Sequence, residues 1–157
     1  MRHQQQGFSL IELLIVVAII LIITAIAVPN FIHAKISANE ASAVTSMHAV
    51  ATAQIGYSTA YPQIGFSASL ADLGPGPAGT CIPTAACFLD PALAAGAKSG
   101  YQFTYLQDAS LTPSIGFTLN ADPVARGLTG QTSFYADQTN SIHYNPTVAA
   151  GPTDPTL

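Results

Sequence analysis

Charged side chains are scarce along the whole chain. Only 8% of the 157 residues are Asp, Glu, Lys or Arg, whereas about a quarter is usual in soluble domains. The four basic residues are isolated from one another, at Arg2, Lys35, Lys98 and Arg126. Proteins that bind nucleic acid neutralise phosphates with clustered Lys and Arg side chains. We therefore expect no nucleic-acid partner.

The chain also lacks the short motifs that mark common catalytic and metal sites. The sequence contains no G-x-S-x-G, no H-E-x-x-H, no phosphate-binding loop and no C-x-x-C. His33 and His48 share no metal-ligand spacing, so we interpret them as surface or packing residues. Asp122, Asp137 and Asp154 do not follow the spacing of a calcium loop and are interpreted as turn residues. We predict no metal, no cofactor and no enzymatic activity.

What the chain does have is one long apolar run near its start, in the segment GFSLIELLIVVAIILIITAIAVPNF. From Phe8 to Val28 only Ser9, Glu12 and Thr24 are not apolar. As a helix this run is about 31 Å long, close to the hydrocarbon thickness of about 30 Å of a bilayer. Glu12 does not fit a plain anchor, because a deeply placed acid costs about 2.5–3.5 kcal/mol. The acid needs a compensating partner.

The segment GFSLIELLIVVAII resembles the class III signal sequence of type IV pilins and of the pseudopilins of type II secretion. The resemblance implies a leader peptide, residues 1–7, that a prepilin peptidase removes by cutting after Gly7. It also implies N-methylation of the new N-terminal Phe8 and a role in assembly for Glu12, the fifth residue of the mature chain. An ordinary signal anchor with a stray acid is the alternative. A secretory signal peptide fits less well, because its apolar core spans only about 7–15 residues.

The spacing between Phe8 and Glu12 has a chemical rationale. Cleavage would free an amine on Phe8 with a reference pKa near 8, and the carboxylate lies about 6 Å further along the helix axis. The carboxylate can therefore reach its own amine or that of a neighbouring subunit. Because an unpaired buried charge is strongly unfavourable, pairing can set the register between subunits. In the competing interpretation Glu12 lies at the level of the lipid headgroups.

The resemblance implies partners and a location as well. The partners are identical subunits in a helical homopolymer, a prepilin peptidase, an inner-membrane assembly machinery and, before assembly, membrane lipid. The chain would cross the inner membrane once, with a cytoplasmic N-terminus that the charge of Arg2 weakly favours. After assembly it would lie in an extracellular pilus.

The fold implied by the resemblance is the α+β pilin fold, a long N-terminal helix packed on a small antiparallel sheet. The sequence divides accordingly into six segments. They are a leader (1–7), a filament-core helix (8–28), an amphipathic helix half (29–60), a loop region with short helices (61–100), a sheet (101–144) and a C-terminal tail (145–157).

Helical spacing in the amphipathic half predicts one apolar stripe, at Ile36, Val44, Met47, Ala51 and Ile55. The polar residues between 35 and 45 are expected on the other face. Pro29 is predicted to bend the helix within 25–29 without ending it. Many pilins have a Gly eight residues before this Pro, but here the position is Leu21, which favours helix by roughly 0.8 kcal/mol.

The loop region carries three local signals. A short helix is possible from Ser67 to Leu73. Asp90 followed by Pro91 is typical of a helix start, with Gly96 ending that turn. Cys81 and Cys87 enclose five residues. We predict a disulfide between them in an oxidising periplasm or at the cell surface, and a metal site is disfavoured because no His or second Cys pair accompanies them.

The last third alternates as strands do. Tyr101, Phe103 and Tyr105 share one face of YQFTYL, Phe117 and Leu119 share one face of GFTLNA, and Phe134 stands in SFYAD. We expect three or four antiparallel strands packed on the amphipathic half of the helix, and a loose tail over 145–157.

Three functions compete. The favoured one is a structural subunit of a type IV pilus. The near alternative is a pseudopilin of type II secretion, and the distant one is a membrane-anchored periplasmic binding or enzymatic domain.

Overall fold

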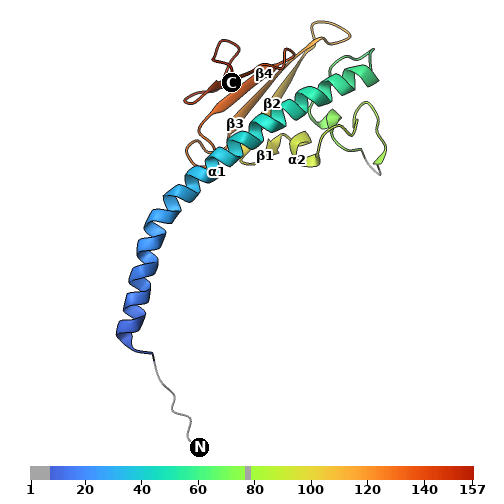
Figure 1. Cartoon of the computed structure of the whole chain (residues 1–157). Helices are drawn as coiled ribbons and strands as arrows, with labels where there is room; N and C mark the ends of the chain where they lie inside the picture. Colours follow the sequence, from blue (N-terminus) through green and yellow to red (C-terminus); the bar gives the residue numbers. More distant parts are fainter. Residues whose placement is uncertain (1–7, 77–78) are drawn as a thin grey trace, which may run out of the picture. The chain divides into compact units, whose positions relative to one another are not determined.

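The computed structural model describes residues 8–76 and 79–157, so the predicted leader lies outside the described residues. The chain forms two compact units, which divide between Lys35 and Ile36. The helix α1, Leu10–Ala60, contributes to both units, and the rest of the second unit is the sheet with its connecting loops (Figure 1). Each unit is described by itself.

Helix α1 continues through Pro29 without interruption. Pro29 has no N–H to donate to the carbonyl of Ala25. Next to it, the Asn30 side chain donates from Nδ2 to the carbonyl of Ile26 at 3.1 Å. The hydroxyl of Thr24 donates to the carbonyl of Leu21 at 3.1 Å. The prediction that Pro29 does not end the helix is confirmed.

In the second unit, one face of α1 packs on the sheet. The buried residues recur at alternating steps of four and three, at Ala43, Met47, Val50, Gln54 and Tyr57. Met47 and Ala51 were predicted for this face and are buried, but Ile55 is 60% exposed, so its assignment was wrong. A helix turns by about 100° per residue, so Ile55 lies off the stripe that Gln54 occupies.

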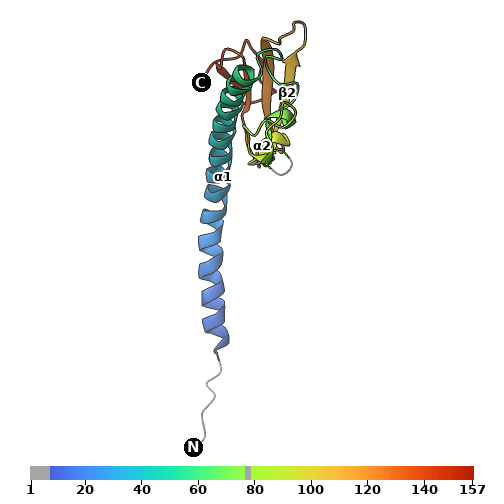
Figure 2. The same cartoon turned by 90° about the vertical axis from the view of Figure 1, so that its right-hand side faces the viewer.

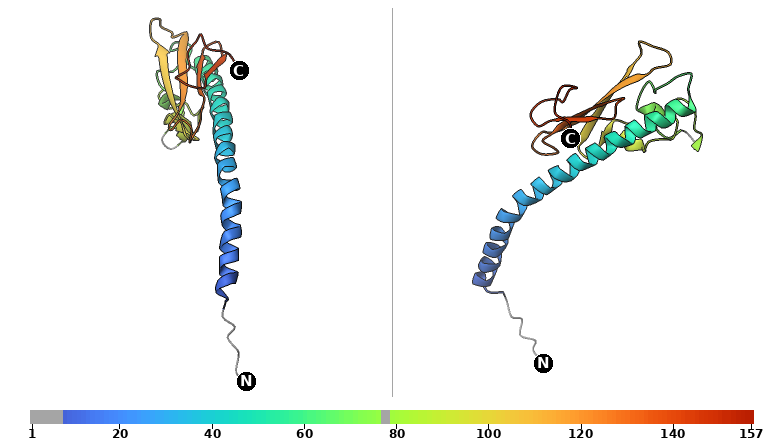
Figure 3. Two further views of the ribbon diagram at one scale, coloured as in Figure 1. Left: turned by 90° about the vertical axis from the view of Figure 1, so that its left-hand side faces the viewer. Right: turned by 45° about the horizontal axis from the view of Figure 1, so that its top comes forward.

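The sheet has five antiparallel strands in the order of the chain. It lies alongside the C-terminal half of α1 (Figures 2 and 3). They are β1 Ala97–Lys98, β2 Tyr101–Asp108, β3 Gly116–Pro123, β4 Ser133–Asp137 and β5 Ile142–Asn145. The predicted alternation holds, because Tyr101, Phe103, Phe117 and Phe134 all belong to the buried core with the α1 stripe. The strand that the sequence did not suggest is β1, which has only two residues.

Among the described residues before the sheet, the structure gives the bounds of two short helical segments. The 3-10 helix η1, Ala71–Leu73, is only the last turn of the short helix expected from Ser67. Helix α2, Pro91–Ala94, starts as predicted, since the Asp90 carboxylate accepts the N–H groups of Ala92 and Leu93 at 3.1 Å each. The Nζ of Lys98 lies 2.9 Å from the other Asp90 oxygen.

The predicted disulfide between Cys81 and Cys87 is present, with the two Cα atoms 5.6 Å apart. Inside the closed loop, Ile82 and Ala85 exchange two backbone hydrogen bonds. The hydroxyl of Tyr57 on α1 donates to the carbonyl of Pro83 at 2.8 Å. The disulfide therefore closes a tight turn that α1 holds in place.

The C-terminal segment is not loose, and the expectation that it would be was wrong. The N–H of Tyr144 on β5 donates to the carbonyl of Pro155 at 2.9 Å, and the N–H of Leu157 donates to the carbonyl of Ile142 at 2.9 Å. Asp154 is the centre of this contact, because its carboxylate accepts from Asn145 Nδ2 at 3.1 Å and from the Gly151 N–H at 2.8 Å. The segment thus covers the outer edge of β5.

Candidate assembly site at the start of the long helix

The first turn of α1 is organised by Glu12. Ser9 precedes the first helical residue, Leu10, and its backbone N–H donates to Glu12 Oε2 at 2.9 Å. This is one half of a capping box, in which an acid at the third helical position accepts the N–H of the residue before the helix. A carboxylate here also interacts favourably with the positive end of the helix dipole.

Phe8 lies directly beside this hydrogen bond. It is 86% exposed, and it precedes the residue whose N–H Glu12 accepts. The structure therefore brings the acid to within one residue of the predicted new N-terminus. Gly7, the other residue of the predicted cleavage junction, lies outside the described residues.

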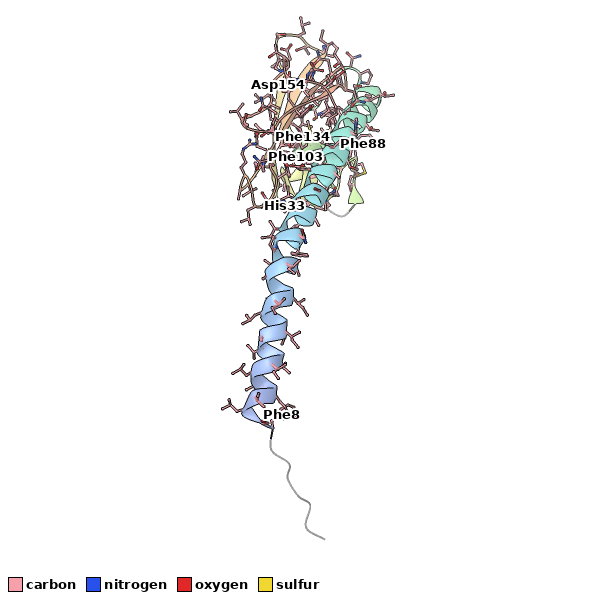
Figure 4. All side chains as sticks on the ribbon, turned by 60° about the vertical axis from the view of Figure 1, so that its left-hand side comes forward. Phe8, His33, Phe88, Phe103, Phe134 and Asp154 are labelled. Atoms are coloured by element: carbon pink, nitrogen blue, oxygen red, sulfur yellow. A yellow bond between two sulfur atoms is a disulfide. The ribbon has the colours of Figure 1, made fainter. Side chains whose placement is uncertain are left out.

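The apolar side chains that follow Glu12 are uncovered on every side of the helix (Figure 4). All residues from 10 to 28 are exposed, and the large apolar ones range from 47% at Val17 to 80% at Leu10. Among the described residues, α1 is the one helix that is long and apolar enough to cross a membrane by length and composition. So large an exposed apolar surface requires lipid or other apolar helices around it.

Sequence reasoning missed two residues that connect α1 to the sheet. Asn39 Nδ2 donates to the carbonyl of Thr129 at 2.7 Å, and Glu40 Oε1 accepts the N–H groups of Gln131 and Thr132 at 2.9 and 3.0 Å. Both had been assigned to the polar face of the helix. Their partners lie about 90 residues away in the chain, so local spacing carries no signal for these contacts.

The sequence also did not predict a polar network in the core. Gln54 is fully buried, and its Nε2 donates to Ser67 Oγ at 2.8 Å while its Oε1 accepts the Ser67 N–H at 2.9 Å. The hydroxyl of Tyr105 on β2 donates to the carbonyl of Ser67 at 2.7 Å. Burial raises the pKa of Tyr105 to about 12. The network links α1, the following loop and the sheet.

The residues considered for metal binding are dispersed. His33 and His48 are exposed on α1. The carboxylate of Asp137 accepts from Thr139, and that of Asp154 anchors the C-terminal segment. Within the described ranges, no three His, Cys, Asp or Glu side chains come close enough together to hold a metal ion.

Comparison with known proteins bears on the N-terminal part of the chain. Residues 2–28 match the family model of the prokaryotic N-terminal methylation motif. The N-terminal segment of this chain therefore carries a prepilin-type methylation motif. The type IV major pilin protein PilA of Myxococcus xanthus (strain DK1622) is 51% identical over 51 residues, which are 32% of this chain and 23% of that pilin. The match thus spans less than a quarter of the relative's length, and no solved structure matches the chain.

The chain has the architecture that the resemblance implied. The long helix with its apolar stretch and the five-stranded antiparallel sheet form an α+β pilin-like fold.

Proposed function

We propose that this protein is a structural subunit of a type IV pilus. In this proposal a prepilin peptidase cuts after Gly7, the new N-terminal Phe8 is N-methylated, and the subunit assembles through α1 into an extracellular homopolymer. Before assembly the chain crosses the inner membrane once with its N-terminus in the cytoplasm, and an inner-membrane machinery extracts it into the filament.

The observation that carries the proposal is the combination of the uncovered apolar helix with a single acid in its first turn. An anchor needs only the apolar surface, and an acid there is a cost. Glu12 accepts a backbone N–H one residue from Phe8 at 2.9 Å, so the carboxylate is already held at the predicted new terminus. In a filament the same carboxylate can pair with the Phe8 amine of a neighbouring subunit, which fixes the register of the packed helices.

Electron microscopy with antibodies against the sheet domain tests the proposal. The full chain is expressed in a bacterium that has a pilus assembly machinery but whose own pilin has been deleted. We expect labelled filaments on the cell surface. Labelled protein confined to the membrane, with no surface filaments, would contradict a pilus subunit and would favour the pseudopilin alternative.

A further inference from the structure

The exposed apolar side chains of the sheet gather at its two opposite ends. At one end of the sheet β2 ends and β3 begins, and the turn between β4 and β5 lies at the same end. Strand β3 ends and β4 begins at the other end (Figure 3). Leu106, Leu111 and Ile115 at the first end are 65%, 55% and 62% exposed. Val124 and Leu128 at the second end are 67% and 58% exposed. Both ends therefore carry apolar surface that the subunit does not bury.

The first end, here called the hairpin end, also carries two acids. Leu106 is paired with Thr118 of β3, and Thr118 with Asp137 of β4, so Leu106 and Asp137 lie on the same face of the sheet. Asp108 is two residues further along the same strand and shares that face. Hydrogen bonds from Ser110 hold the pKa of the Asp108 carboxyl below its ordinary value, so the group is ionised at neutral pH. The hairpin end is thus apolar with a negative rim.

The second end, here called the 124–128 loop, carries a cation. The guanidinium of Arg126 donates to the carbonyls of Gln131 and Pro146 and to the hydroxyl of Ser133. These three acceptors are neutral, and the described part of the chain places no carboxylate within ion-pair distance of Arg126. The nearby acid, Glu40, is occupied by two backbone N–H groups of residues 131 and 132. The loop therefore presents a positive charge between two exposed apolar side chains.

We propose that the two ends are the two halves of one contact between copies of this chain, in which the 124–128 loop of one subunit docks on the hairpin end of the next. The inference rests on the proposed function. An open filament needs a heterologous contact, made by two different surfaces of the same subunit. The hairpin end and the 124–128 loop meet that need, because they lie at opposite ends of one sheet and their charges are complementary. Docking buries Val124 and Leu128 against Leu106, Leu111 and Ile115.

Cysteine cross-linking in assembled filaments tests the contact. A chain with both Leu106→Cys and Leu128→Cys is expressed in place of wild type, and its sheared filaments are treated with a short bismaleimide. We expect a ladder of covalent multimers, because each subunit is joined to the next through unlike positions. Leu106→Cys alone and Leu128→Cys alone are the matched controls, and each should remain monomeric.

The outcomes separate the inference from the proposed function. Filaments that form but give no ladder overturn the docking of these two ends. Dimers from Leu106→Cys alone overturn it as well, since they show like ends meeting. If the double variant and the wild type both give no filaments, the proposed function fails and the inference fails with it.

A charge inserted into the contact gives a second readout. Leu106→Glu adds a third acid to the hairpin end, and we expect it to abolish filaments while the membrane-bound protein stays at its wild-type level. Thr104→Glu is the matched control, because Thr104 is exposed on the same face of β2 but lies two residues further from the hairpin. Equal filament yields from the two variants would overturn the proposed contact.

Discussion

Glu12 and Ser9 form a hydrogen bond across the first turn of the long helix, from the Ser9 backbone N–H to Glu12 Oε2 at 2.9 Å. The acid at the apolar end of the helix is therefore already engaged in the unprocessed chain. In the proposed processing, cleavage would create an amine on Phe8, and the carboxylate would then gain a charged partner in place of a neutral one. Charge-assisted hydrogen bonds are about twice as strong as neutral ones.

Substitution of Glu12 should separate membrane insertion from assembly. Glu12→Ala removes the cost of placing an acid in lipid, so we expect insertion at least equal to wild type and few or no filaments. Glu12→Gln keeps an acceptor for the Ser9 N–H but loses the charge. If charge pairing sets the register, Glu12→Gln should also fail to assemble, as quantified by immunoblots of sheared filaments and of membranes. Wild-type filament yield from either variant would show that the charge is not needed.

Gln54 should be a stability residue of the second unit. Gln54→Ala leaves the buried N–H of Ser67 without its acceptor and removes the amide that donates to the Ser67 hydroxyl, and we expect a loss of about 1–3 kcal/mol in the free energy of unfolding. Thr52→Ala is the matched control, since Thr52 is exposed on the same helix and should change stability by less than about 0.5 kcal/mol. Urea unfolding of the full chain in detergent, followed by circular dichroism, provides the comparison. Similar urea midpoints for the two variants would mean that the hydrogen bonds of Gln54 contribute nothing to the stability of the fold.

The raised pKa of Tyr105 predicts a loss of stability at alkaline pH. Burial raises this pKa from 10.0 to about 12, so the folded chain keeps a proton that the unfolded chain has already released. The contribution is complete below pH 10.0 and is lost as the pH rises from there to about 12. Tyr105→Phe should weaken this pH dependence, as measured by urea unfolding across the range. An identical pH profile in the variant would contradict the assignment to Tyr105.

Pro29 matches a proline that many type IV pilins have, but Leu21 stands where those pilins have a Gly. This difference predicts a short unwound segment in the filament. Many family members have a Gly at the position of Leu21, and the helix between that Gly and the Pro opens on assembly. Leu favours helix over Gly by roughly 0.8 kcal/mol, so we expect any unwinding to stay within about residues 25–29. Leu21→Gly should extend the unwound segment toward residue 21 in a cryo-electron microscopy map. A wild-type map already unwound back to Leu21 would show that packing between subunits decides where the helix opens.

Local sequence signals anticipated the elements whose causes are local. The apolar run predicted the long helix, whose first residue, Leu10, lies two residues after the predicted start at residue 8. Asp90 with Pro91 predicted the start of α2, because a cap acts within three residues. The alternation of Tyr101 and Phe103 identified the buried face of β2 for the same reason. The prepilin motif is also a continuous stretch, so it was readable without the fold.

Contacts between distant parts of the chain were not anticipated. Helical spacing alone could not show whether Gln54 or Ile55 faces the sheet, because the choice depends on Ser67 and Tyr105. Three prolines made the C-terminal segment look loose, yet Asp154 fixes it against β5 through Asn145 and Gly151. In each case a polar side chain takes its role from a partner that periodicity does not locate.

Mass spectrometry of the N-terminus of the filament protein tests the central claim most directly. Filaments sheared from cells that express the wild-type chain are purified, digested and analysed for their N-terminal peptide. The account predicts a peptide that begins at Phe8 and carries one methyl group on its amine. A peptide that begins at Met1, with residues 1–7 intact, would contradict it.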